Sequence, residues 1–272
     1  MAPYTVHETL LRVNGVSLAL GGAPILRQVE AEIKNIKRPG LSQGQVVALL
    51  GPSGVGKTKL FEVLAGLRKP DTGSVTVTEA SVPVRMGMVG VVDQQSTLRR
   101  NRTVLGNLVL AARIKGMSRA EAEAKAIDYL KQFSLLDKRA LYPAQLSGGQ
   151  RQRVAIIQQL LSSEHFLLMD EPFSGLDPLM KDKACRLVAD VAAADELNTI
   201  VVTTHDIESA IAIADTLWIL GRDRDEKGAS LGARIQHVYD LAAMGLAWDP
   251  DIQSRQQFFE MRKEVKATFA NL

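Results

Sequence analysis

The sequence predicts an α/β fold in which parallel strands are preceded by antiparallel strands and interrupted by a helical segment. Three short apolar runs, at about 46–50, 166–170 and 200–204, have the length and composition of buried parallel strands. A glycine-rich turn and an amphipathic pattern over 57–67 follow the first run, and this order is how an α/β unit begins.

The antiparallel strands are expected near the N-terminus. Residues 10–20 and 25–33 alternate apolar and polar side chains in short runs, and Gly21-Gly22 and Pro24 separate the two runs. Alternation with turn residues between the runs is typical of antiparallel strands. A basic loop over 34–44 then leads into the first parallel strand.

The helical segment is predicted over about 97–160. Ser118 and Glu121 have the spacing of a capping box, followed by strong helix formers. Ser147 and Gln150 form a second box, but Gly148 and Gly149 lie inside it and are poor residues for a helical turn. Glycines at a helix N-terminus let an anion approach the free N–H groups, so this turn is a candidate anion site.

The C-terminal part is predicted to hold two more strands and a helix. The runs 215–220 and 233–241 are strand-like and flank a charged turn, 221–230. The stretch 253–269 fits an amphipathic helix. Its expected apolar face consists of Phe258, Met261, Val265 and Phe269.

Composition narrows the class of protein. The 272-residue chain has 33 basic and 30 acidic residues, and a net charge of +3 does not favour a nucleic-acid partner. The single cysteine, Cys185, excludes an internal disulfide and is expected to pack as a small apolar side chain on a helix. The sequence has no signal-peptide pattern and no apolar run approaching the roughly 18 to 20 residues that cross a bilayer. We therefore expect a cytoplasmic chain that only another protein would hold at a membrane.

The motif GPSGVGKT at 51–58 matches the pattern G-x-x-x-x-G-K-[ST] of a phosphate-binding loop, the P-loop. Its backbone N–H groups are predicted to wrap the α- and β-phosphates of a nucleotide, Lys57 to reach the β- and γ-phosphates, and Thr58 to bind Mg²⁺. The expected ATP contacts are Gly51, Pro52, Ser53, Gly54, Val55, Gly56, Lys57, Thr58 and Lys59. The alternative, an ordinary glycine turn before a helix, is disfavoured by the apolar strand in front of it.

Two adjacent acids, Asp170 and Glu171, end the apolar run at 166–170. Asp170 is predicted to hold the Mg²⁺, and Glu171 to orient or deprotonate the attacking water. The two acids would otherwise only cap the next element. His205 follows the run at 200–204, so parallel strands would place it on the same sheet edge, the edge where open α/β sheets bind ligands. It is therefore a candidate γ-phosphate contact, whereas His7, His165 and His237 are expected to be structural.

Five motifs in order, GPSGVGKT, LSGGQ, LLMDEP, SGLD and TTHD, resemble those of the ATP-binding subunit of ABC transporters. The resemblance covers about residues 8–240 and implies a P-loop NTPase core of the ABC-ATPase type. It also implies that two subunits pack head to tail around two ATP molecules. Residues Ser147, Gly148, Gly149 and Gln150 would then contact the ATP bound by the partner subunit, and Asp177 would lie at the dimer seam.

The resemblance also implies a domain division and partners. Residues 1–240 would form the nucleotide-binding domain, with a helical subdomain at about 97–160, and 241–272 a short helical tail. A glutamine that senses Mg²⁺ is expected, and spacing favours Gln94 over Gln95. The surface at about 94–112 would bind the permease, and a substrate-binding protein would deliver the solute to that permease. The second subunit is expected to be another copy of the chain.

The sequence departs from the family pattern in three places. Leu20 stands where an aromatic residue normally stacks on adenine, so the base would gain apolar contact but no stacking. The residues 157–159, Ile-Gln-Gln, replace a usual Ala-Arg-Ala. Lys59 follows Thr58 where a second Ser or Thr is common. None of these changes removes a catalytic group.

The C-terminal part resembles the ends of ATPases from the nitrate, sulfonate and taurine importer group. The sequence therefore predicts an ATPase on the cytoplasmic face of the membrane that energises import of a small solute. The alternatives are an exporter ATPase, an ABC ATPase acting on DNA or ribosomes, and a regulatory module with poor hydrolysis. The chain has neither a long coiled-coil insertion nor a second ATPase cassette, and its intact Lys57, Asp170, Glu171 and His205 disfavour the regulatory module.

Overall fold

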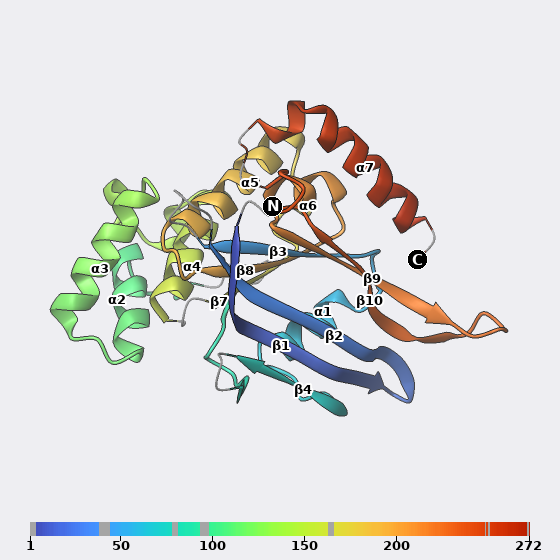
Figure 1. Cartoon of the computed structure of the whole chain (residues 1–272). Coiled ribbons are helices and arrows are strands. Elements are labelled where there is room, and N and C mark those ends of the chain that lie inside the picture. Colours follow the sequence, from blue (N-terminus) through green and yellow to red (C-terminus); the bar gives the residue numbers. More distant parts are fainter. Residues whose placement is uncertain are drawn as a thin grey trace.

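The computed structural model of the chain describes residues 4–37, 44–77, 81–92, 98–162, 166–247, 249, 251–270 and 272. Its strands form one ten-stranded sheet in the order β5-β4-β1-β2-β10-β9-β3-β8-β7-β6. Helices α5, α6 and α7 lie on one side of this sheet, and α2 and α3 stand away from it at one end (Figure 1). Within these ranges, no helix is both long and apolar enough to cross a bilayer.

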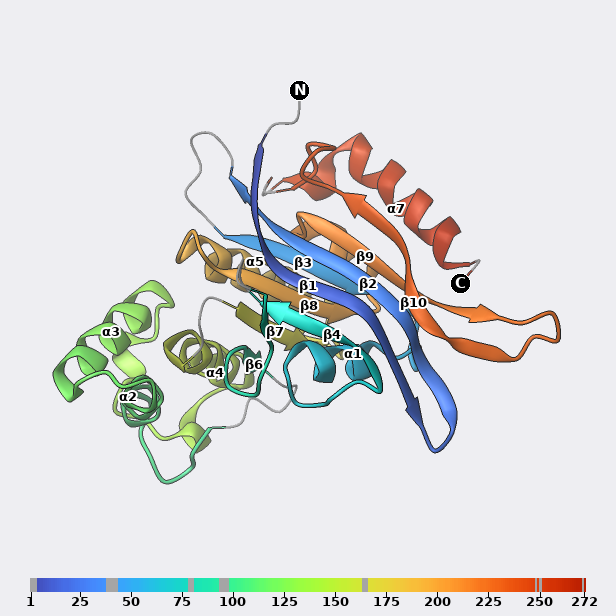
Figure 2. The same cartoon turned by 60° about the horizontal axis from the view of Figure 1, so that its bottom comes forward.

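The centre of the sheet is parallel, as the three apolar runs predict. Strands β3 (Gln45–Leu50), β8 (Thr199–Thr204) and β7 (Phe166–Asp170) pair in parallel, and β6 (Gly90–Val92) adds to β7. Every residue of β3 and β8 is buried. Alternate residues face two separate cores, because successive side chains of a strand point to opposite faces. Helix α1 (Lys57–Leu64) covers one face and belongs to the second core (Figure 2).

Helix α1 is shorter than the predicted stretch 57–67. It ends because Gly66 takes a left-handed φ of 68°, a conformation typical of helix C-termini. A Cβ at this glycine would lie 2.6 Å from the backbone of Arg85, so the neighbouring loop also fixes the glycine there.

The antiparallel part is one long hairpin with two edge strands. Strand β1 (Thr5–Leu20) pairs with β2 (Ala23–Lys37), and Gly21-Gly22 form the turn between them. Strand β4 (Thr72–Val77) pairs with β1, and β5 (Val82–Pro83) pairs with β4. The alternation predicts the β1–β2 hairpin correctly, although β1 begins earlier and β2 extends further at both ends, whereas β4 and β5 have no counterpart in the sequence prediction. In these extensions Thr5 pairs with Lys37 and both side chains are exposed, while Asn35 is buried.

The helical segment consists of α2 (Val104–Ile114), α3 (Arg119–Gln132) and α4 (Gly148–Ser162). Both predicted capping boxes are confirmed. The Ser118 amide donates to the Glu121 carboxylate at 2.9 Å, and the Ser147 amide donates to Gln150 Oε1 at 2.9 Å. Leu108, Leu130 and Ile156 are fully buried and join the three helices to the larger core.

The two predicted C-terminal strands and the predicted C-terminal helix are present, and the helix that follows β8 is an element that the sequence does not predict. Helix α5 (Pro178–Ala193) and α6 (Ile207–Ile213) flank β8, and β9 (Thr216–Arg224) and β10 (Ser230–Asp240) form an antiparallel hairpin. Pairing continues through the charged residues 222–224, so the connecting turn is shorter than predicted. Helix α7 (Gln256–Phe269) buries Phe258, Met261 and Val265. Cys185 on α5 is buried, as predicted, and burial raises the pKa of its thiol to about 11.

Candidate active site

The glycine-rich turn joins the end of β3 to the start of α1. Gly56 precedes the helix with a φ of 124°, a conformation that L side chains rarely adopt. At Gly51, a Cβ would approach the Leu220 carbonyl oxygen to 2.8 Å. Both positions therefore require glycine. Ser53, Gly54 and Thr58 are exposed and open to a ligand.

Lys57 is held beneath this turn. Its side chain is only 6% exposed, and Nζ donates to the carbonyl oxygens of Gly51 at 2.8 Å and Pro52 at 3.2 Å. The same Nζ lies 3.1 Å from Glu171 Oε1. A buried ammonium group needs such partners because burial without them is costly. The lysine is therefore already positioned at the loop that surrounds it.

The two acids stand at the end of β7, where β8 fixes their geometry. Asp170 pairs with Thr203 across the sheet, and the Thr203 hydroxyl donates to Asp170 Oδ1. The Glu171 amide donates to the Thr203 carbonyl at 3.0 Å and to its hydroxyl at 3.2 Å. Glu171 has a φ of 48°, which is uncommon for a residue other than glycine. The two adjacent carboxylates have different partners, Thr203 for Asp170 and Lys57 for Glu171.

His205 completes the cluster on the other side of Glu171. Its Nδ1 lies 2.9 Å from Glu171 Oε2, and its side chain is 48% exposed. Each oxygen of Glu171 therefore has one partner, Lys57 or His205. The structure thus brings Lys57, Glu171 and His205 together at the carboxyl ends of β3, β7 and β8, which is the sheet edge that the sequence predicts.

Two residues that contribute to this site have no recognisable signal in the sequence. Thr203 is one residue of an apolar strand, and only the β7–β8 register places it against Asp170. Arg222 lies in what the sequence presents as a charged turn, yet its guanidinium donates to the Gly54 carbonyl in the P-loop. Strand pairing decides both contacts.

Other predicted residues lie apart from the cluster. Leu20 is 36% exposed at the end of β1. Asp177 caps α5, where its carboxylate accepts from the Met180 amide at 2.9 Å. Lys59 forms an ion pair with Glu62. Gln94 lies outside the described residues, as do Gln95 and His165.

The LSGGQ turn is exposed at the start of α4. Ser147, Gly148 and Gly149 are all exposed, and a Cβ at Gly149 would meet nothing within 4 Å. Gly148 and Gly149 border a cavity of about 540 Å³ that extends to Asp170 and Glu171. The described residues that line this cavity include none from the P-loop, 51–58.

The oxygen donors present suit Mg²⁺ when phosphate supplies further ligands. Within the described part of the chain, no group of three His, Cys, Asp or Glu is arranged to hold a metal ion. Thr58 offers an exposed hydroxyl, and Asp170 offers a carboxylate fixed by Thr203. One or two protein oxygens plus substrate phosphates are a usual way of binding Mg²⁺. Thr58 and Asp170 therefore fit a site that forms with the nucleotide.

The sequence matches the ABC transporter family over residues 37–174, just over half of the chain, and the chain belongs to this family. The sulfate/thiosulfate import ATP-binding protein CysA of Vibrio vulnificus is 37% identical over 225 residues, which are 80% of this chain and 62% of that protein. The protein of the same name from Caulobacter vibrioides is 38% identical over 226 residues, covering 80% of this chain and 63% of that protein. The chain therefore spans less than two thirds of the length of these relatives.

Solved structures agree on the fold class. The structure of cbiO1 from Clostridium perfringens, described as part of the ABC transporter complex cbiONQ, aligns with a TM-score of 0.73 and 21% identity. The alignment covers 96% of this chain and all of that chain. The ATP-binding cassette MJ0796, a dimer in a post-hydrolysis state bound to ADP and Pi, aligns with a TM-score of 0.65 and 27% identity over 85% of this chain and 99% of that chain. The predicted fold, a P-loop NTPase core of the ABC type, is confirmed.

Proposed function

We propose that the chain is the Mg²⁺-dependent ATPase subunit of a membrane transporter that imports a small solute. The observation that carries this proposal is the arrangement around Glu171, with Lys57 Nζ at 3.1 Å and His205 Nδ1 at 2.9 Å, beside a P-loop. Membership of the ABC transporter family supports it. The relatives named as sulfate/thiosulfate import proteins favour import and a sulfur oxyanion as the solute, which is close to the sulfonate class suggested by the C-terminal sequence.

Each site residue has a distinct task in ATP hydrolysis. The loop amides of 51–58 and Lys57 bind the phosphates, and Mg²⁺ held by Thr58 and Asp170 would neutralise charge on the β- and γ-phosphates. Glu171 orients the attacking water and accepts its proton as the new P–O bond forms and the bond to ADP breaks. His205 contacts the γ-phosphate.

The arrangement also favours a change in Lys57 when ATP binds. Lys57 uses two loop carbonyls and Glu171 as partners, and phosphate oxygens would compete for the same three donors. Transfer of Lys57 from Glu171 to the phosphates would leave that carboxylate free to take the water. Phosphate binding and activation of the general base would then be one linked event.

We propose in addition that two copies of the chain share each ATP site. The described residues that line the cavity beside Gly148 and Gly149 include none from the P-loop, and the space at Gly149 is open for a ligand from outside the chain. The free amides at the start of α4 suit an anion. Ser147, Gly148, Gly149 and Gln150 would cover the γ-phosphate held by the partner, with Asp177 at the seam.

The proposed position of the chain in the transporter follows from its membership of the ABC transporter family. The chain would sit on the cytoplasmic face of the membrane and bind the permease through residues at about 94–112, with Gln94 sensing Mg²⁺. A separate substrate-binding protein would deliver the solute to the permease. Residues 1–240 would act as the nucleotide-binding domain, including the helical subdomain at about 97–160, and 241–272 as a helical tail.

A complementation experiment tests the shared site. Lys57→Ala removes P-loop function and Gly149→Asp places a carboxylate against the partner's γ-phosphate, so each variant alone should have no turnover. A mixed dimer would keep one intact site, formed by the unchanged P-loop of one chain and the unchanged LSGGQ turn of the other. An equal mixture should recover roughly one quarter of wild-type ATPase activity if pairing is random and the sites act independently.

The controls separate the possible failures. Gly149→Asp should still bind ATP at its own P-loop, because the new side chain enters open space. An equal mixture that shows no more turnover than either variant would contradict the shared site. Wild-type chain without ATPase activity, with or without its permease, would contradict the proposed enzyme. Reconstitution with that permease in vesicles then distinguishes import from export.

A further inference from the structure

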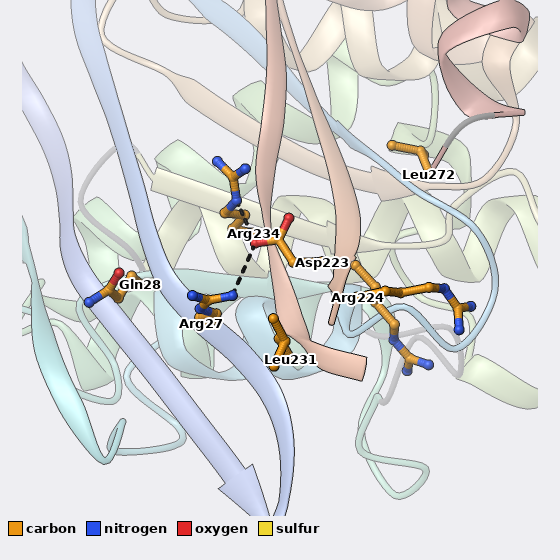
Figure 3. Close-up of a pocket in the computed structure, with 8 residues that line it drawn as sticks. Arg27, Gln28, Asp223, Arg224, Leu231, Arg234 and Leu272 are labelled. Atoms are coloured by element: carbon orange, nitrogen blue, oxygen red, sulfur yellow. Dashed lines mark hydrogen bonds and ion pairs between the residues drawn. The ribbon is translucent and has the colours of Figure 1, made fainter. Parts of the chain in front are cut away.

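A second cavity, of about 740 Å³, lies on strands β2, β9 and β10 (Figure 3), and Arg222 is the residue that it shares with the active site described above. Four arginines from these strands line it, together with one acid, Asp223. The arginines are Arg27, Arg222, Arg224 and Arg234. Their charges exceed that of the acid by 4 − 1 = 3, in a chain whose whole net charge is only +3. We call this cavity the arginine pocket.

Asp223 neutralises only part of this charge. Its Oδ2 lies 2.7 Å from Arg234 Nε and 3.7 Å from Arg27 Nη1, so one carboxylate serves two guanidinium groups (Figure 3). Gln236 also donates to the same carboxylate, at 3.3 Å. The acid therefore holds Arg27 and Arg234 in place and leaves most of their N–H groups available to a ligand, since a guanidinium has five.

The other two arginines have unused donors as well. Arg222 donates one Nη2 hydrogen to the Gly54 carbonyl, while its Nε is buried and has no hydrogen-bond partner among the residues that the structure describes. Arg224 donates to the Gly228 carbonyl at 3.0 Å and is otherwise exposed. A buried donor without a partner is rare in folded proteins, because it forgoes its bond to water.

We propose that the arginine pocket binds a phosphate or sulfate group, either as the free anion or on a small molecule. A guanidinium offers a planar pair of donors that matches the oxygens of such groups. A dianion would offset two of the three excess charges, which a single carboxylate cannot do. The volume lies within the range of small-molecule pockets, and Leu231 adds an apolar wall that would contact the body of an ester. Arg222 places this ligand one side chain away from the P-loop.

The test is calorimetric titration of the full chain saturated with Mg-ADP, so that the P-loop phosphates are already bound. Inorganic phosphate, sulfate and ribose 5-phosphate are titrated separately. We expect one equivalent to bind with a Kd below about 1 mM, a loss of about tenfold for each arginine removed, and hence about 100-fold weaker binding in Arg27→Ser/Arg234→Ser. Tighter binding of ribose 5-phosphate would identify an ester as the ligand, and tighter binding of phosphate or sulfate would identify the free anion.

A matched control removes the same charge elsewhere. Arg12 pairs with Glu32 at 2.7 Å and Arg262 pairs with Glu208 at 2.8 Å, so Arg12→Ser/Arg262→Ser lowers the net charge equally without touching the pocket. This variant should bind within about twofold of wild type. If Arg27→Ser/Arg234→Ser fails to fold, Arg224→Ser replaces it as the test variant, because the Arg224 side chain is exposed, and it should bind the anion about tenfold more weakly. Absence of saturable binding of all three anions, or equal loss in the control, would overturn the proposal.

Discussion

Replacing Glu171 by glutamine should separate ATP binding from ATP hydrolysis. The substitution keeps the shape of the side chain, and its amide oxygen can still accept from Lys57, which lies 3.1 Å from the native carboxylate. The backbone contacts of residue 171 to Thr203 do not depend on the side chain. The variant therefore loses one negative charge and one proton acceptor while the fold remains.

The expected loss follows from those two changes. A positioned general base contributes about 10²- to 10⁴-fold to a rate, which corresponds to about 2.7 to 5.4 kcal/mol of barrier. ATP affinity should stay the same or rise, because Lys57 no longer has an anionic partner that competes with the phosphates. The same loss of charge should favour a closed dimer with ATP retained.

Single-turnover release of phosphate and equilibrium binding of a fluorescent ATP analogue measure the two quantities independently. Light scattering with Mg-ATP reports the trapped dimer. Turnover within about threefold of wild type would refute the assignment of Glu171 as the base. A parallel loss of ATP affinity would instead indicate that residue 171 acts mainly by holding Lys57.

Three further outcomes are expected. Arg222→Ser should weaken ATP binding a few-fold in an equilibrium titration, because it removes the bond that holds the Gly54 carbonyl; unchanged affinity would mean that the loop holds its shape alone. Cys185 should react with a thiol reagent at pH 8 only as fast as the chain unfolds, because burial raises its pKa to about 11; rapid labelling of folded protein would contradict this. Burial alone would raise the pKa of Asp206, but its bonds to Lys181 and to the start of α6 lower it overall. A group whose pKa is lowered by folding stabilises the folded state at pH values above its unfolded pKa, near 4, and this stabilisation is lost as the pH falls through its folded pKa. Asp206→Asn should therefore lower the free energy of unfolding by up to about 1 kcal/mol at pH 7, and by progressively less below pH 4, as measured by denaturant unfolding. A cost independent of pH would contradict the ion pair.

The sequence by itself determined the central parallel strands, the two capping boxes and the motif of the P-loop. Buried strands such as 46–50 are recognisable because every side chain in them is apolar, and the capping box at Ser147 and Gln150 is a local signal that needs no tertiary context. The motif at 51–58 is likewise local, since its glycines serve one turn of backbone. Element ends were less certain, as α1 shows by stopping at Leu64.

Only the tertiary structure decided which residues meet. Thr203 holds Asp170 because β8 pairs with β7 in one register, and a shift of one residue would turn the hydroxyl to the other face. Arg222 contacts Gly54 across 168 positions in the chain. Asp223 pairs with Arg27 across 196 positions and with Arg234 across 11. Such contacts depend on strand order and twist, which no local pattern encodes. Local propensity therefore specified the phosphate loop, whereas strand pairing built the active site and the arginine pocket around it.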